Sequence, residues 1–107
     1  GRIIKNDKGA FQQIVEEKDA DTEQKKIREV NTGTYIFDSH YLFRGLKRIT
    51  NRNAQGEYYL PDVLQYVRES GFDVKTLLLH DAIEGSGINS RDELARLEEY
   101  LKKSGLD

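Results

Sequence analysis

The sequence predicts a mixed α/β fold, in which a mixed sheet is flanked by helices. Short runs rich in β-branched and aromatic residues alternate along the chain with segments whose apolar residues recur at helical spacing. This order of elements, strand pairs alternating with helices, favours a mixed α/β or α+β class.

The first predicted element is a β-hairpin. Residues 2–5 and 10–17 have the composition of strands, and they flank Asn6-Asp-Lys-Gly9. The glycine of this connection suits the positive φ that a tight turn requires. Residues 22–28 are strongly polar, and we expect them to form one helical turn.

A third strand and a first helix are predicted next. Residues 29–37 favour a strand because they are rich in β-branched and aromatic side chains. Ser39 is expected to cap a helix that places Leu42, Leu46 and Ile49 on one face through their i, i+4, i+7 spacing. We expect that face to be core.

A second helix is predicted after a polar loop. Pro61 suits its first turn, and the helix carries Val63, Leu64 and Val67. Gly71 suits the left-handed residue that ends it.

The C-terminal part predicts a strand over residues 72–79 and a third helix. Ser90 and Glu93 have the spacing of a capping box. A stripe of leucines continues this helix as far as Gly105: Leu94, Leu97 and Leu101. The chain shows no internal repeat and no internal linker, so residues 1–107 are expected to form one domain.

Composition narrows the functional classes. The 17 basic and 19 acidic residues give a net charge of −2 without long runs of one sign, which disfavours nucleic acid as a partner. The absence of cysteine excludes disulfides and thiolate catalysis and is compatible with a cytoplasmic location. No apolar run approaches the ~20 residues of a membrane span. The chain starts without methionine on a strand-like run, so we expect an excised or processed segment.

The most distinctive motif is Asn51-Arg-Asn-Ala-Gln-Gly-Glu-Tyr-Tyr-Leu-Pro-Asp62. Its many polar groups favour a loop that faces a substrate. The tyrosines have a simpler interpretation, in which they pack on the helix that Pro61 begins and keep their hydroxyls in water.

Other candidate residues also have two interpretations. Asn31-Thr-Gly33 lies inside a predicted strand and marks either a β-bulge with a satisfied asparagine or the close approach of a ligand. Glu16 and Glu17 are more typical of one solvated and one salt-bridged carboxylate than of a catalytic pair. Glu16 and Lys18 share a strand face by their spacing. Asn89 suits a loop residue beside a helix cap.

Two histidines, His40 and His80, have no partner at metal-ligand spacing and are expected at the surface or at caps. The chain contains no Cys/His cluster, no nucleophile elbow and no Walker-type phosphate loop.

Five motifs in order resemble the uridylyltransferase domain of bacterial bifunctional N-acetylglucosamine-1-phosphate uridylyltransferase/glucosamine-1-phosphate acetyltransferase. They are Gly1-Arg-Ile-Ile4, Ile14-Val-Glu-Glu-Lys-Asp19, Glu29-Val-Asn-Thr-Gly33, residues 51–62 and Gly87-Ile-Asn-Ser-Arg91. The resemblance covers the whole chain but only the second, sugar-binding half of that domain. It implies the second half of a Rossmann-like nucleotidyltransferase domain, without the nucleotide-binding half or the β-helix acetyltransferase domain.

The resemblance also implies roles for residues. Glu16 and Asn31 would bind sugar hydroxyls, with Lys18 nearby, and the backbone of Gly1 would bind the sugar nucleotide. Glu57 and Tyr59 would lie at the N-acetylglucosamine pocket. Asn89 would bind Mg²⁺ beside an aspartate of the nucleotide-binding half, since Mg²⁺ takes only one or two protein oxygens together with phosphate and water. None of these residues is expected to be catalytic in the strict sense.

The implied reaction joins UTP and N-acetylglucosamine 1-phosphate into UDP-N-acetylglucosamine, a peptidoglycan precursor for the cell wall, and pyrophosphate. We expect the fragment alone to be inactive and to self-associate as a dimer or by strand exchange, whereas the complete family forms trimers. The alternatives are a nucleotidyltransferase for another hexose 1-phosphate and a non-catalytic interaction domain of the same fold.

Overall fold

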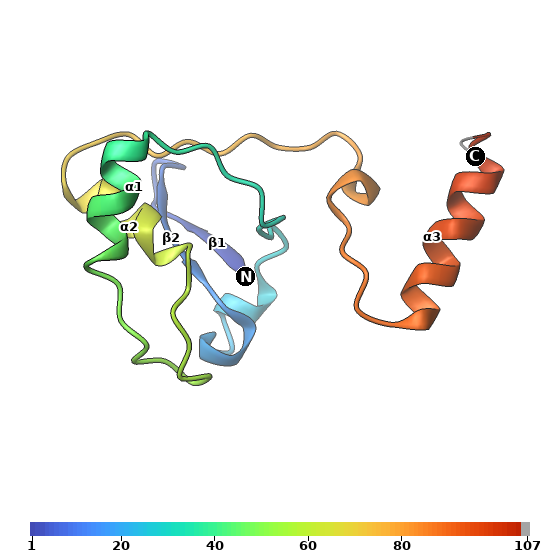
Figure 1. Ribbon diagram of the computed structural model, residues 1–107, viewed down its shortest axis with the longest axis horizontal. Helices are drawn as coiled ribbons and strands as arrows, with labels where there is room; N and C mark the ends of the chain where they lie inside the picture. Colours follow the sequence, from blue (N-terminus) through green and yellow to red (C-terminus); the bar gives the residue numbers. More distant parts are fainter. Residues whose placement is uncertain (106–107) are drawn as a thin grey trace. The chain divides into compact units, whose positions relative to one another are not determined.

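The computed structural model describes residues 1–105 and divides the chain into two compact units, Gly1–Leu77 and Leu78–Asp107. Figure 1 shows the chain coloured from its N-terminus to its C-terminus. In the described residues the chain forms two β-strands, three α-helices and three short 3₁₀ helices. The predicted mixed α/β class is therefore confirmed, although the sheet has only two strands.

The first unit begins with the predicted hairpin. Strands β1 (Arg2–Lys5) and β2 (Phe11–Val15) pair antiparallel, with an irregularity in register at the turn end of β1. Gly9 has a φ of 78°, and the side chain of Asn6 accepts a hydrogen bond from the Ala10 backbone at 2.9 Å. Turn chemistry alone thus closes the hairpin, as predicted.

Two short 3₁₀ helices follow the hairpin: η1 (Glu17–Asp19) and η2 (Gln24–Lys26). The second lies within the polar segment for which one helical turn is predicted. The first ends β2 at Val15, two residues earlier than predicted. Because a helical turn replaces the strand, the prediction that Glu16 and Lys18 share a strand face is wrong.

The core of the first unit lies where helix α2 (Asp62–Glu69) packs against both strand β2 and helix α1 (Ser39–Leu46). The buried apolar residues of the described chain come from β2 and α2: Phe11, Ile14, Val63 and Val67. In Figure 1 the two helices lie side by side next to the hairpin. The contact between them is close because Gly45 of α1 faces Val63.

Helix α1 begins and packs differently from the prediction. Its cap is Asp38, whose carboxylate accepts a hydrogen bond from the His40 backbone at 3.0 Å, and not Ser39, which is its first helical residue. Aspartate and serine are both strong capping residues, so adjacent candidates compete. Leu46 is 41% exposed, because the buried position on this face is taken by Gly45.

Helix α2 follows its prediction. Pro61 is the residue before its first turn, Val63 is fully buried, and Gly71 has a φ of 92° just after its end. Only glycine takes this conformation without strain, and it lets the chain leave the helix.

Two predicted strands, residues 29–37 and 72–79, are wrong. In the first, Val30 forms an isolated bridge with Arg2, and Ile36 is fully exposed. In the second, Leu77 is 91% exposed. A strand needs a neighbouring backbone to accept its hydrogen bonds. Within residues 1–105 no strand pairs with these segments, and the isolated bridge at Val30 is the one β-contact that they make.

The second unit contains the 3₁₀ helix η3 (Ala82–Gly85) and helix α3 (Arg91–Lys103). The predicted cap is confirmed, since the Ser90 hydroxyl accepts a hydrogen bond from the Glu93 backbone at 3.1 Å. Gly105, with a φ of 72°, follows the end of α3 as predicted. The leucine stripe of α3 is not buried: Leu94 is 51% exposed.

None of the helices in residues 1–105 combines the length and the apolar character needed to cross a membrane.

Candidate functional site

A polar cleft of about 300 Å³ lies in the first unit, where the end of β2 and helix η1 meet the loop that precedes α2. The lining residues are Gln13, Ile14, Val15, Glu16, Asp19, Gln24, Thr50, Arg52, Asn53, Tyr59 and Asp62. Three carboxylates and one tyrosine hydroxyl thus share the cleft with amide groups. Such a set of hydrogen-bonding groups suits a small ligand that carries several hydroxyls.

Gly1 lies beside Glu16, which lines this cleft, and Asn31 is bonded to Gly1. The Gly1 amino nitrogen lies 3.4 Å from the Glu16 carboxylate, and the Asn31 backbone donates to the Gly1 carbonyl at 2.9 Å. A Cβ on Gly1 would lie 2.7 Å from Ile14 Cγ2 and 3.0 Å from Glu16 Oε1. Position 1 therefore has no room for a side chain, and its backbone stays accessible to a neighbouring group.

Asn31 has an irregular local structure. Its side-chain oxygen accepts a hydrogen bond from the Gly33 backbone at 2.9 Å, and Gly33 has a φ of 83°. The asparagine is thus satisfied locally through its oxygen, but it does not lie in a β-bulge, because residues 31–37 form no strand. Its amide nitrogen makes no hydrogen bond to backbone within residues 1–105; it carries two protons, so with one directed to the Tyr35 hydroxyl it can still donate the other to a ligand.

Tyr35 joins this group, although the motifs did not single it out. Burial raises the pKa of its hydroxyl, the neighbouring Asn31 side chain opposes part of that shift, and the negative charge of Glu16 adds to it. No sequence pattern predicts this neighbourhood, because Gly33, with a φ of 83°, interrupts the alternation of side chains that a strand would have.

The opposite wall of the cleft is the loop of residues 51–59. The Tyr59 hydroxyl donates to Asp19 Oδ2 at 3.3 Å and accepts from Gln55 Nε2 at 2.8 Å. Burial raises the pKa of Tyr59, and the negative charge of Asp19 adds to that effect. The hydroxyl therefore stays protonated at neutral pH.

Asp62, at the start of α2, completes the acidic lining. Burial raises the pKa of this carboxyl, and the negative charges of Asp19 and Glu16 raise it further. A raised pKa in a cleft is characteristic of functional carboxylates, but it also occurs in structural clusters. Glu17 differs from these groups: it pairs with Arg2, whose hydrogen bond lowers the pKa of that carboxyl.

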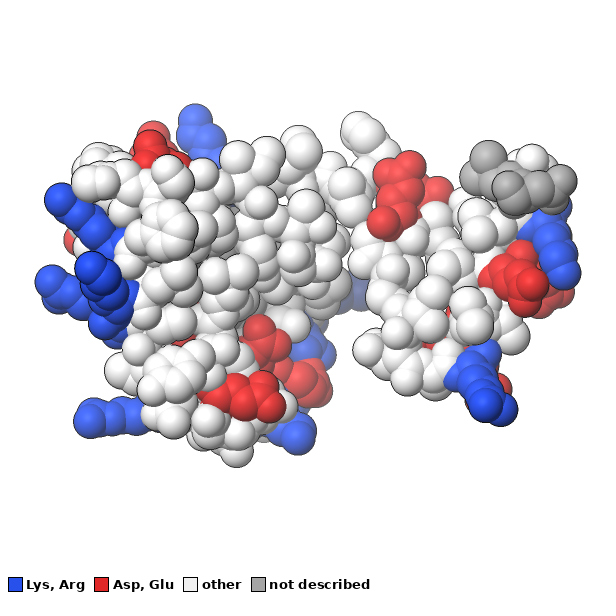
Figure 2. Space-filling view, viewed as in Figure 1, with Lys and Arg blue, Asp and Glu red and all other residues white. Residues whose placement is uncertain are grey.

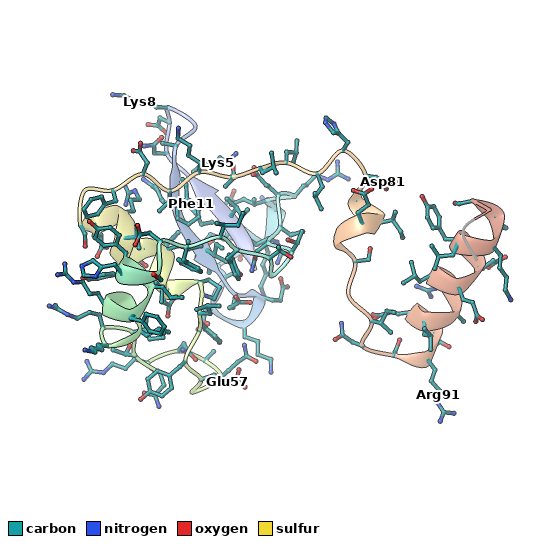
Figure 3. All side chains as sticks on the ribbon, turned by 45° about the horizontal axis from the view of Figure 1, so that its top comes forward. Lys5, Lys8, Phe11, Glu57, Asp81 and Arg91 are labelled. Carbon is teal, nitrogen blue, oxygen red and sulfur yellow. The ribbon has the colours of Figure 1, made fainter. Side chains whose placement is uncertain are left out.

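Glu57 is outside this cleft. Figure 3 labels it at the tip of the loop, and its backbone is held by Asn53, whose side-chain nitrogen donates to the Glu57 carbonyl at 2.6 Å. The side chain is exposed. The structure therefore brings Glu16 and Tyr59 together in one cleft, with Gly1 beside Glu16 and Asn31 bonded to Gly1, and leaves Glu57 at the loop tip.

Asn89 belongs to the second unit and is exposed. Its backbone nitrogen donates to Glu93 Oε2 at 2.6 Å, whereas its side chain makes no hydrogen bond within the described residues. The amide oxygen is a hard ligand of the type that Mg²⁺ accepts. Because residues 1–105 hold no group of three His, Cys, Asp or Glu at metal spacing, Asn89 would supply one ligand and not a complete site.

Charge is unevenly distributed over the first unit. Figure 2 shows its Lys and Arg side chains gathered mainly at one edge and its Asp and Glu side chains in separate small groups, with uncharged surface between them. A polyanion would need a continuous basic surface. The face shown in Figure 2 has no such surface.

Comparisons with known proteins show what the chain is similar to. No family model matches it. Over 103 residues, 96% of the chain, it is 50% identical to the bifunctional protein GlmU of Halalkalibacterium halodurans, and it is 47% identical to that of Streptococcus thermophilus and 45% to that of Bacillus subtilis. The chain spans only 22–23% of the length of these relatives.

Proposed function

We propose, starting from the homology of this chain to a segment of the bifunctional GlmU proteins, that it is the sugar-binding part of a nucleotidyltransferase. The complete enzyme joins UTP and N-acetylglucosamine 1-phosphate into UDP-N-acetylglucosamine and pyrophosphate, for cell-wall synthesis in the cytoplasm. The observation that carries the proposal is the shared cleft of Glu16 and Tyr59, with Gly1 beside Glu16 and Asn31 hydrogen-bonded to Gly1.

The chemistry of the cleft fits a pyranose ring. The Glu16 carboxylate is 24% exposed and accepts hydrogen bonds from neighbouring sugar hydroxyls. The Asn31 amide nitrogen donates to a ring substituent, and Gly1 lets Glu16 lie directly against the backbone because it has no side chain. These groups bind and orient the sugar, whose phosphate then attacks the α-phosphate of UTP and displaces pyrophosphate.

Asn89 is the residue of this chain that would hold Mg²⁺. The ion supplies neutralisation of phosphate charge when bound. Asn89 contributes one amide oxygen, presented from a loop whose backbone is tied to Glu93.

A nucleotidyltransferase for another hexose 1-phosphate is the second candidate. One observation favours it: the cleft offers groups for ring hydroxyls, whereas Glu57, which was expected at the acetylated sugar, lies outside the cleft at the loop tip.

The test uses a chimaera, in which this chain replaces the aligned residues of the Bacillus subtilis relative. With Mg²⁺ and UTP, the chimaera is expected to release pyrophosphate with N-acetylglucosamine 1-phosphate and much less with glucose 1-phosphate. The isolated chain is expected to show no turnover. Glu16→Gln in the chimaera should lower kcat/KM about tenfold to a hundredfold, since a hydrogen bond to a charged group is lost.

The matched control is Glu23→Gln, because Glu23 is an exposed glutamate whose partner is Lys26 on the surface. This variant should keep its turnover. A folded chimaera without turnover would contradict the proposed function. Equal use of the two sugar phosphates would favour the second candidate instead.

A further inference from the structure

The loop of residues 51–59 is organised around its own Asn53. The side-chain oxygen of Asn53 accepts from the backbones of Gln55 and Glu57, both at 3.2 Å, and its nitrogen donates to the Glu57 carbonyl. These bonds shape the loop but do not attach it to the rest of the unit.

Asp19 supplies that attachment. Its Oδ1 accepts from the Ala54 backbone at 2.7 Å, and its Oδ2 accepts from the Tyr59 hydroxyl at 3.3 Å. These bonds join residues 35 and 40 positions apart, the longest separations among the side-chain hydrogen bonds in the described part of the chain. The bond to Ala54 is the short one and anchors the loop, whereas the longer bond orients the tyrosine.

The position of Asp19 is coupled to that of Glu16. Helix η1 is a single turn in which the Asp19 backbone donates to the Glu16 carbonyl at 2.9 Å. The carboxylate proposed to bind the sugar and the carboxylate that holds the loop are therefore fixed by the same turn. Both line the cleft together with Tyr59.

Asp19 also decides what Tyr59 offers to a ligand. An ionised carboxylate only accepts hydrogen bonds, so the hydroxyl proton of Tyr59 is directed to Asp19. One lone pair of the hydroxyl is used by Gln55 Nε2. The remaining lone pair makes Tyr59 an acceptor for a ligand hydroxyl or amide N–H, and not a donor.

We propose that Asp19 is a positioning residue for sugar binding, which holds the 51–59 loop against the cleft and orients the Tyr59 hydroxyl as an acceptor. This role rests on the proposed function. Asp19 itself acts through Ala54 and Tyr59 and need not touch the sugar.

The experiment compares Asp19→Ala, Asp19→Asn and Tyr59→Phe in the chimaera. Asp19→Ala removes both bonds. Asp19→Asn keeps an oxygen for Ala54 but presents an amide to Tyr59, so it should restore part of the function. The matched control is Glu23→Ala, because Glu23 is an exposed carboxylate near the same turn that pairs with Lys26 and does not line the cleft.

Asp19→Ala is expected to raise KM for N-acetylglucosamine 1-phosphate about tenfold, with KM for UTP changed less than about twofold. The KM of Asp19→Asn for N-acetylglucosamine 1-phosphate should lie between that of Asp19→Ala and that of the unsubstituted chimaera, the parent. The double variant Asp19→Asn/Tyr59→Phe should raise KM for the sugar phosphate little more than the stronger of the two single variants does. Both changes remove the same interaction, the bond between Asp19 and the Tyr59 hydroxyl. The control should match the parent.

Independent effects of Asp19→Asn and Tyr59→Phe, or an unchanged KM for the sugar phosphate in Asp19→Ala, would overturn the assignment. Amide hydrogen exchange at Ala54 in the 107-residue chain separates this failure from failure of the proposed function. Exchange should be slow in the parent and in Glu23→Ala and faster in Asp19→Ala. A folded chimaera without turnover refutes the proposed function. Equal exchange rates of the Ala54 amide in the parent, the control and Asp19→Ala refute the attachment of the loop by Asp19.

Discussion

Asn89 shows how structural and functional roles can be separated within one residue. Its backbone is held by Glu93, whereas its exposed side chain makes no hydrogen bond in the described residues. Asn89→Ala therefore keeps the structural bond and removes only the proposed metal ligand. In the chimaera we expect turnover to fall at least tenfold, which corresponds to a rise of about 1.4 kcal/mol in the activation barrier. The Mg²⁺ concentration that gives half-maximal turnover should rise as well.

The melting temperature of Asn89→Ala should equal that of the parent. Asn89→Asp retains an oxygen ligand and serves as the conservative variant, with turnover above that of Asn89→Ala. Unchanged turnover together with a lowered melting temperature would assign Asn89 to the start of α3 and not to the metal.

Residues of the site were predictable to different degrees. Glu16 and Tyr59 belong to distinctive motifs, and the structure places both in one cleft. Asp19 and Asp62 were overlooked, although each is the last residue of a quoted motif. Their contribution depends on contacts across about 40 residues of chain, which no local pattern displays. Binding roles for these residues remain proposals.

Gly45 determines how closely helices α1 and α2 approach. A Cβ at this position would lie 2.6 Å from Val63 Cγ1 and 3.1 Å from Tyr66 Cδ1. Alanine favours a helix by up to ~1 kcal/mol over glycine, but overpacking a core costs about 1–3 kcal/mol. Because Val63 is fully buried and has little freedom to move, we expect Gly45→Ala to lower the free energy of unfolding by about 1 kcal/mol.

Urea unfolding of the chain measures this change. Arg44→Ala, on the exposed side of the same helix, is the control and should leave the midpoint nearly unchanged. Adding Val63→Ala to Gly45→Ala should cost less than the sum of the two single changes, since the smaller side chain makes room. A stabilised Gly45→Ala variant would show that the two helices can separate without loss.

Elements with local signals were predicted correctly, and elements that depend on distant partners were not. The hairpin and the end of α2 are specified by Gly9 and Gly71, and the start of α3 by Ser90. Residues 29–37 and 72–79 have the composition of strands, but composition does not supply the neighbouring backbone that a ladder requires.

At the scale of the whole molecule, the extended segments leave large apolar side chains in water. Ile36 is fully exposed, Leu77 is 91% exposed and Leu78 is 77% exposed. Extended backbone with exposed apolar side chains is prone to pair with another chain. We therefore expect the 107-residue chain to form dimers or larger species.

Light scattering over a range of concentrations measures this association. Ile36→Lys and Leu77→Lys should each shift the mass toward the monomer, whereas Arg44→Lys should not. A strictly monomeric mass at the highest concentration would contradict the expectation.

The boundary between the two units was not visible in the sequence. It falls between Leu77 and Leu78, in an apolar run that lacks the glycine, serine or proline of a typical linker. The same run predicted a strand. The apolar composition of residues 72–79 therefore predicted a strand where the boundary between the units lies. The division of the chain became apparent only from the contacts within each unit.

The hydrogen bonds that the Asn53 side chain makes within its own loop affect the thermodynamics of ligand binding. Three side-chain bonds already restrict the backbone from Asn53 to Glu57 in the free chain. Much of the conformational entropy of this segment is therefore lost during folding and not during ligand capture. A ligand that enters the cleft therefore binds to a loop that is already ordered. A larger part of the free energy of each contact is then retained as affinity.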